Sequence, residues 1–98
     1  MIENCLCCGN KLKITEKKYM LAKMCCDISY DYNIIVRTIV IGNRDIYLEY
    51  IIDHDTTEIW RDNYPIEDRY IGSISGSDLF KIDMQEAKIK LENILVLI

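Results

Sequence analysis

Two neighbouring segments in the middle of the chain, residues 32–41 and 44–52, are mostly hydrophobic with a few polar residues among them. Both are rich in Ile, Val and Tyr, which favour strands, and only Gly42-Asn43 separates them. Gly at the first position of a two-residue loop is typical of a type II′ β-hairpin. That loop predicts a register in which Ile39 faces Ile46. The pattern leaves open which face is buried, because neither face is uniformly polar.

Shorter segments on both sides of this hairpin predict further strands. Residues 10–15 alternate polar and apolar positions and residues 17–28 are largely apolar, which predicts an N-terminal hairpin. Residues 53–57 are polar and favour a turn. Residues 58–65 predict a short strand that the chain's one proline ends, and residues 68–75 are either another strand or an irregular edge.

The C-terminal segment, residues 83–98, has the spacing of an amphipathic helix. Asp83, followed three residues later by Glu86, matches the acidic form of a capping box. Apolar residues recur at helical intervals, at positions 84, 87, 91, 94, 95 and 98.

Together these elements predict an α+β fold, an antiparallel β-sheet with a zinc-ribbon-like N-terminal hairpin and one C-terminal helix. The chain has 98 residues, half of them hydrophobic, which suits one domain with its own core. Within this single domain, 1–98, we expect a knuckle and hairpin in 1–30, antiparallel strands in 31–82 and the helix in 83–98. Residues 72–77, rich in Gly and Ser, are interpreted as a surface loop.

Cysteine spacing near the N-terminus points to a metal. Cys5 and Cys8 are separated by two residues and followed by Gly9, so both sulfurs can reach one ion from a tight turn. The next cysteines, Cys25 and Cys26, follow at the distance that a zinc ribbon uses for its second pair. The candidate ligands of a structural zinc ion are therefore these four cysteines.

The second pair departs from the ribbon pattern, since its two cysteines are adjacent and neighbours on a strand face opposite ways. His54 and Asp27 are alternative fourth ligands, and a homodimer in which two chains share the ligands is a further alternative. Three interpretations stay open: an intact zinc site, a ribbon that has lost its metal, and a coincidence of spacing.

Charge is distributed unevenly along the chain. The net charge is −4, but residues 38–98 hold twelve acids against six basic groups, a net of −6, while residues 1–37 carry a net of +2. An acidic protein is a poor general binder of nucleic acid. The charge favours a protein partner with a basic surface.

Seven Tyr and one Trp accompany these acids, and both residue types are frequent in protein interfaces. The predicted partner-contact residues are Tyr30, Tyr32, Tyr47, Glu49, Asp53, Asp55, Trp60, Asp62 and Tyr64.

The sequence contains no constellation typical of an enzyme. The one histidine, His54, lies in a polar turn without a nucleophile in a recognisable motif, and residues 72–77 lack the Lys-Ser/Thr ending of a phosphate-binding loop. The start of the chain has no basic region followed by an apolar run, and no segment is long enough to span a membrane. We therefore expect a cytoplasmic, non-enzymatic protein with reduced thiols.

The segment CLCCGNKLKI…KMCC, residues 5–26, followed by Ile- and Tyr-rich strands and a C-terminal helix, resembles small bacteriophage proteins that begin with a zinc-ribbon-like head. The resemblance is specific over about a quarter of the chain and lacks the fourth ribbon cysteine. It implies a module that binds and inhibits a host protein, such as a defence protein. The alternative from the residues themselves is a zinc-ribbon nucleic-acid-binding protein that uses Lys11, Lys13, Lys17 and Lys18.

Overall fold

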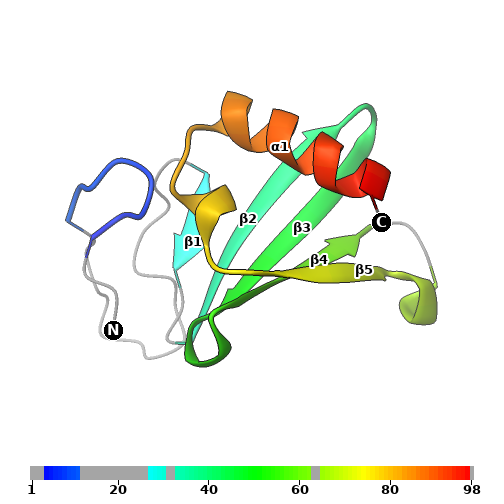
Figure 1. Cartoon of the computed structure of the whole chain (residues 1–98), viewed down its shortest axis with the longest axis horizontal. Helices are drawn as coiled ribbons and strands as arrows, with labels where there is room; N and C mark the ends of the chain where they lie inside the picture. The colour runs from blue at the N-terminus through cyan, green and yellow to red at the C-terminus, as the bar shows by residue number, and fades with distance from the viewer. Residues whose placement is uncertain (1–3, 12–26, 31–32, 63–64, 98) are drawn as a thin grey trace.

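The computed structural model describes residues 4–11, 27–30, 33–62 and 65–97. Five strands form one antiparallel sheet in chain order, with α1 packed across one face (Figure 1). The strands are β1 (Ile28–Tyr30), β2 (Ile34–Ile41), β3 (Arg44–Ile51), β4 (Thr56–Arg61) and β5 (Tyr70–Ser75). Three short 3₁₀ turns, η1 (Ile52–His54), η2 (Ile66–Asp68) and η3 (Asp78–Phe80), precede α1 (Met84–Leu97). The predicted α+β class, with an antiparallel sheet and a C-terminal helix, is confirmed.

The central hairpin has the predicted turn and register. Gly42 has a φ of 66°, whereas Asn43 is not among the residues with positive φ, which is the pattern of a type II′ turn. Ile39 pairs with Ile46, and every other pair follows from the two-residue loop.

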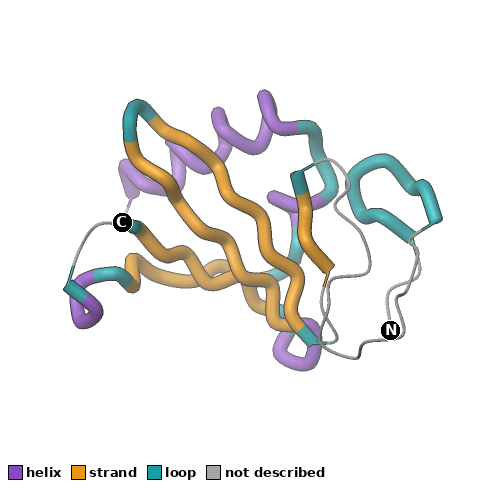
Figure 2. Tube along the Cα trace, turned by 180° about the vertical axis from the view of Figure 1, so that it is seen from behind, coloured by secondary structure: helices purple, strands orange, loops and turns teal. Residues whose placement is uncertain are grey.

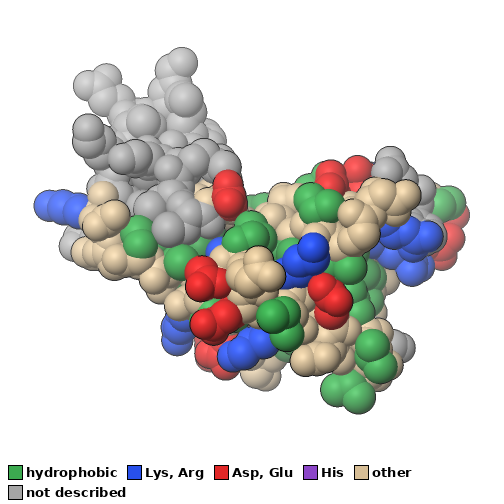
Figure 3. Space-filling view, turned by 90° about the horizontal axis from the view of Figure 1, so that it is seen from above, with side chains coloured by type: hydrophobic (Ala, Val, Ile, Leu, Met, Phe, Trp, Pro, Cys, Tyr) green, Lys and Arg blue, Asp and Glu red, His purple; other side chains and the backbone are tan. Residues whose placement is uncertain are grey.

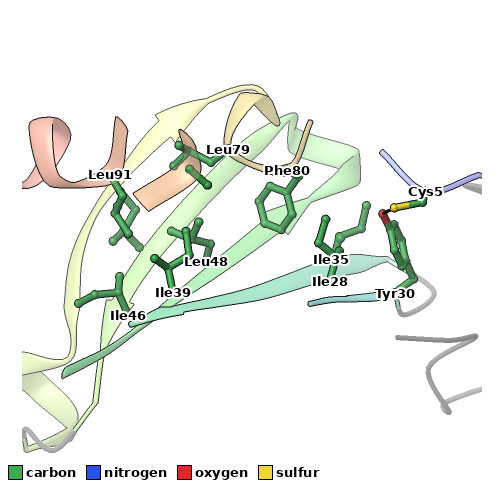
Figure 4. Close-up of a cluster of buried hydrophobic side chains, with 12 residues drawn as sticks. Cys5, Ile28, Tyr30, Ile35, Ile39, Ile46, Leu48, Leu79, Phe80 and Leu91 are labelled. Carbon is green, nitrogen blue, oxygen red and sulfur yellow. Dashed lines mark hydrogen bonds between the residues drawn. The ribbon is translucent and has the colours of Figure 1, made fainter. Parts of the chain in front are cut away.

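The structure settles which face of the hairpin is buried. Ile35 and Ile39 of β2 and Leu48 of β3 are fully buried, and they pack with Phe80 and Leu91 from η3 and α1. Figure 4 shows these side chains converging between the sheet and the helix. The face that begins with Ile41 opposite Arg44 is therefore the core face, and Val36, Thr38 and Val40 lie on the other.

The helix begins where the capping box predicts. The backbone N–H of Glu86 donates to Asp83 Oδ1 at 2.9 Å, which satisfies one of the free donors of the first turn. Ala87 and Leu91 are buried, so the predicted apolar stripe does face the sheet.

A charged residue, Arg37, is part of the core face. Its side chain is 1% exposed, and Nη1 donates to the carbonyl oxygens of Leu79 and Ile82, both at 2.8 Å. Burying a guanidinium is costly unless it is hydrogen-bonded, and these two carbonyls partly compensate. Arg37 thereby joins the middle of the sheet to the segment that leads into α1.

The predictions for the turn, the Gly/Ser-rich loop and the N-terminal hairpin have different outcomes. The turn predicted at residues 53–57 is confirmed as far as Asp55, which has a φ of 47° and follows η1, but β4 already begins at Thr56, so the last two residues of that range belong to a strand. The interpretation of residues 72–77 as a loop is wrong for its first part, because β5 continues to Ser75 and pairs with β4. Most of the predicted N-terminal hairpin, within residues 10–28, lies outside the described residues.

Candidate functional site

Residues 4–11 form a tight turn around Cys5. The N–H of Gly9 donates to the carbonyl of Cys5 at 2.9 Å, and the N–H of Cys5 donates to Asn10 at 2.8 Å. Gly9 has a φ of 77°, a conformation that suits glycine because it has no Cβ. Asn4 and Lys11 close the turn as an isolated antiparallel bridge. The glycine behind Cys8 therefore has the turn-forming role that the sequence indicated.

The sulfur of Cys5 lies at the centre of this turn. The side chain is 3% exposed, and the hydroxyl of Tyr30 donates to Sγ at 3.2 Å (Figure 4). Burial raises the pKa of the thiol, but hydrogen bonds from Tyr30 and from the backbone N–H groups of Cys8 and Cys7 outweigh it, and the pKa falls to about 6. The turn thus stabilises a thiolate, the form in which cysteine binds metals.

The two other cysteines of the turn point in different directions. Cys7 donates its thiol to the carbonyl oxygen of Ile82 at 3.3 Å and packs against the core. Cys8 is exposed, and its side chain also hydrogen-bonds to Cys5. Cys25 and Cys26 lie outside the described residues. Within the described ranges, no three His, Cys, Asp or Glu side chains group closely enough to hold a metal ion, and zinc stays a prediction.

The polar turn between β3 and β4 holds the other predicted metal and contact candidates. Asp53, His54 and Asp55 are all exposed at this end of the sheet. Tyr50 donates to Asp55 Oδ1 at 2.6 Å, and the hydroxyl of Thr56 donates to the carbonyl of His54. These contacts fix the turn, and none of them joins His54 to a cysteine of the N-terminal turn.

The face of the sheet turned away from α1 carries most of the predicted contact residues that the structure describes. We call this the open face and define it by side chains from β2, β3 and β4 and the residue after β4: Val36, Thr38, Val40, Asp45, Tyr47, Glu49, Glu58, Trp60 and Asp62. Four predicted residues meet here: Tyr47, Glu49, Trp60 and Asp62.

The prediction for Tyr30 is wrong. Its side chain is 4% exposed and belongs to the core, where the hydroxyl also accepts the N–H of Leu6 at 2.9 Å. Its position opposite Ile35 places it on the core face, which sequence alternation alone did not identify. Tyr32 and Tyr64 lie outside the described residues.

Several acidic side chains lie close together on the open face. Glu49 and Glu58 are directly opposite each other on neighbouring strands. Burial, and then the charge of Glu58, raises the pKa of Glu49. The charge of Asp62, followed by burial and by Asp45, raises the pKa of Tyr47. Glu58 was not among the contact residues predicted from the sequence, and the β3–β4 register places it on this surface.

Aromatic rings lie beside these acids, because Tyr47 pairs with Trp60 across β3 and β4. Trp60 and Tyr70 meet edge to face with ring centroids 5.1 Å apart. Tyr70 is exposed, and Nε1 of Trp60 is buried and has no hydrogen-bond partner among the described residues. The open face therefore combines acids with aromatic rings, whereas on the helix side basic, acidic and hydrophobic side chains are interspersed (Figure 3).

Comparison with family models, with curated proteins and with solved structures finds no match to this chain. None of the helices in the described part of the chain has the length and apolar character needed to cross a membrane. Of the lysines proposed for nucleic-acid binding, Lys11 is exposed and the other three lie outside the described residues. The candidate functional sites of the described residues are therefore the Cys5 turn and the open face.

Proposed function

We propose that this chain is a non-enzymatic protein-binding module that contacts a partner with a basic surface through its open face. The observation that carries the proposal is the Glu49–Glu58 pair. Like charges directly opposite on neighbouring strands destabilise a sheet. The repulsion between the two carboxylates destabilises the free protein. A Lys or Arg of a partner placed between them would reduce that repulsion.

Aromatic residues beside the acids support the same proposal. Tyr47 and Trp60 are adjacent across β3 and β4, and Tyr70 continues the aromatic area onto β5. Tyr and Trp supply much of the binding energy of protein interfaces, and Arg stacks on aromatic rings. A basic partner would find both carboxylates and ring faces on this surface.

The resemblance of residues 5–26 to zinc-ribbon-headed bacteriophage proteins supports a partner class. We infer that the partner is a host protein that the chain inhibits, for example a defence protein whose basic surface normally holds nucleic acid. An acidic, aromatic surface suits competition for such a site.

Affinity capture from a host lysate tests this proposal. The wild type is compared with the double variant Glu49→Gln/Glu58→Gln, and the matched control is Glu86→Gln/Glu92→Gln, which removes the same charge from exposed positions on α1. Support is a basic protein that the wild type and control retain and the open-face variant loses. Equal capture by all three proteins, or substrate turnover by the purified chain, would contradict the proposal.

We also propose that Cys5 and Cys8 are two ligands of a structural zinc ion in a zinc-ribbon-like hairpin, with Cys25 and Cys26 as candidates for the others. Backbone N–H groups already directed at Cys5 Sγ support this, since such donors stabilise a metal-bound thiolate. Metal analysis of the purified protein tests it. One zinc per chain or per pair of chains, lost in Cys8→Ser and kept in Cys7→Ser, is expected; zinc-free protein purified without chelators would contradict it.

A further inference from the structure

The side chains of Cys5 and Cys8 lie on the same side of the N-terminal turn. The N–H of Gly9 donates to the carbonyl oxygen of Cys5, which closes one helical turn over residues 5–9. In such a turn the Cβ atoms of residues three apart are about 5–6 Å from each other. A disulfide needs a separation of about 3.5–4.5 Å. The two side chains are already hydrogen-bonded to each other, so a small closure of the turn brings their sulfurs to bonding distance.

The third cysteine of the turn is directed elsewhere. Cys7 donates its thiol to the carbonyl oxygen of Ile82 at 3.3 Å and packs against the core. Cys7 and Cys8 are adjacent, and a disulfide between adjacent residues strains the peptide that joins them. Among the cysteines that the structure describes, Cys5 and Cys8 are therefore the pair suited to a disulfide.

The two sulfurs differ in access and in environment. Cys8 is exposed, on a turn that lies at the outer edge of the molecule beyond β1 (Figure 2), so a reagent in solvent reaches it first. Cys5 is buried, and its Sγ accepts hydrogen bonds from the hydroxyl of Tyr30 and from backbone N–H groups. Such donors stabilise negative charge on the sulfur, and the thiolate is the nucleophile of disulfide exchange. One sulfur is thus open to solvent, and the other is placed to attack it from within the turn.

We propose that Cys5 and Cys8 form a reversible disulfide by exchange with a small-molecule disulfide such as oxidised glutathione. The Cys8 thiolate attacks one sulfur of the reagent, forms a mixed disulfide and releases one thiolate, which takes up the proton that Cys8 lost. The Cys5 thiolate then attacks Cys8 Sγ and releases the second thiol in the same way. Two protein thiols are oxidised to one disulfide while the reagent is reduced to two thiols, so no further oxidant is needed.

The hydrogen bonds to Cys5 Sγ also make this disulfide easy to reduce. They stabilise the reduced form, in which the sulfur carries charge, and they weaken when the sulfur becomes neutral in the disulfide. A disulfide whose reduced form is stabilised is a strong oxidant. An excess of reduced thiol should therefore reopen the bond, which suits a regulatory disulfide rather than a structural one.

This disulfide goes beyond the proposed zinc site and does not depend on it. Both use the same two sulfurs, and zinc binds them as separate thiolates, so the ion and the disulfide exclude each other. Zinc-free protein should still form the disulfide. A protein without zinc would contradict the zinc proposal alone, whereas a protein without the disulfide would contradict this proposal alone.

Peptide mapping of the full chain tests the proposal. The protein is incubated with oxidised glutathione and a chelator, free thiols are alkylated, and the chain is digested. Trypsin cleaves after Lys11, so residues 1–11 form one peptide that contains three of the five cysteines. Tandem mass spectrometry should find this peptide with alkylated Cys7 and a disulfide between Cys5 and Cys8. Prior treatment with excess reduced glutathione should return the peptide with all three thiols alkylated.

Two variants complete the design. Cys8→Ser should lose the disulfide, because Cys7 faces the core. Cys7→Ser is the matched control, since it removes a thiol from the same turn, and it should form the disulfide as the wild type does. The proposal fails if the wild-type peptide keeps three free thiols, if a mixed disulfide with glutathione persists at Cys8, or if the disulfide includes Cys7. The wild-type map decides among these outcomes even where a variant does not fold.

Discussion

Cys7 and Arg37 donate to the same acceptor, the carbonyl oxygen of Ile82, at 3.3 and 2.8 Å. One comes from the N-terminal turn and the other from the second strand, and the carbonyl lies two residues before α1. A single peptide group therefore ties the Cys5 turn, the sheet and the approach to the helix together.

Replacing Arg37 should strongly destabilise the fold. Arg37→Ala leaves the Leu79 carbonyl without this donor, leaves the Ile82 carbonyl with Cys7 alone, and opens a cavity, so we expect a loss of about 2–4 kcal/mol in the free energy of unfolding. Urea denaturation measures it. Lys90→Ala, an exposed change on α1, serves as the control and should stay within about 0.5 kcal/mol of the wild type. A loss no larger than the control's would show that the two hydrogen bonds contribute little.

The hydroxyl of Tyr30 should contribute measurably to the stability of the fold. Tyr30→Phe removes a donor to Cys5 Sγ and an acceptor of the Leu6 N–H, so we expect a loss of about 1–3 kcal/mol. Tyr47→Phe removes a hydroxyl from the open face and should change stability by less than about 0.5 kcal/mol. Thermal unfolding of both variants checks the contrast; equal midpoints would contradict it.

Glu49 should make stability depend on pH. Its pKa is higher in the folded protein than in an unfolded chain, so the folded state holds the proton more tightly. Stability is therefore greatest in acid as far as this group is concerned, and it falls as the pH rises from 4.5, the ordinary pKa of a glutamate, through the raised pKa.

Glu49→Gln should remove that slope and add about 0.5 kcal/mol at neutral pH. Glu58→Gln should reduce the slope without removing it, because burial of Glu49 remains. Chemical denaturation across a pH series measures both variants, with Glu92→Gln as the control. An unchanged slope in Glu49→Gln would mean that another group is responsible.

Gly42 should tolerate substitution less well than its neighbour. Its φ of 66° is unfavourable for residues with a Cβ, although the space around it is open. Gly42→Ala should therefore cost about 1–2 kcal/mol from backbone strain alone. Asn43→Ala is the matched control and should cost less. Comparable losses in urea denaturation would argue against the type II′ turn.

The sequence was sufficient where the chemistry is local. Gly42 fixed the hairpin register, and Asp83 fixed the start of α1, because turns and caps depend on a few adjacent residues. The sequence alone did not predict which side chains are buried where burial depends on tertiary packing. Arg37 is charged yet lies on the buried face, and Tyr30 was expected at the surface but packs against Cys5. Nothing in the local pattern indicated that carbonyls from η3 and the segment before α1 would cover this face.

The candidate sites also differ in whether the local sequence predicts them. The turn around Cys5 followed from the positions of Cys8 and Gly9. The opposition of Glu49 and Glu58 depends on how β3 pairs with β4. This is a property of strand pairing, which single residues do not encode.

The contact between Cys7 and Ile82 spans 75 residues of sequence, whereas each strand of the sheet pairs with the next one along the chain. Pairing strands that are neighbours in the chain costs little loop-closure entropy, so the sheet can form early in folding. The N-terminal turn can dock only after the chain has returned through η3 to the start of α1. Weakening that docking should therefore speed unfolding while leaving the folding rate nearly unchanged.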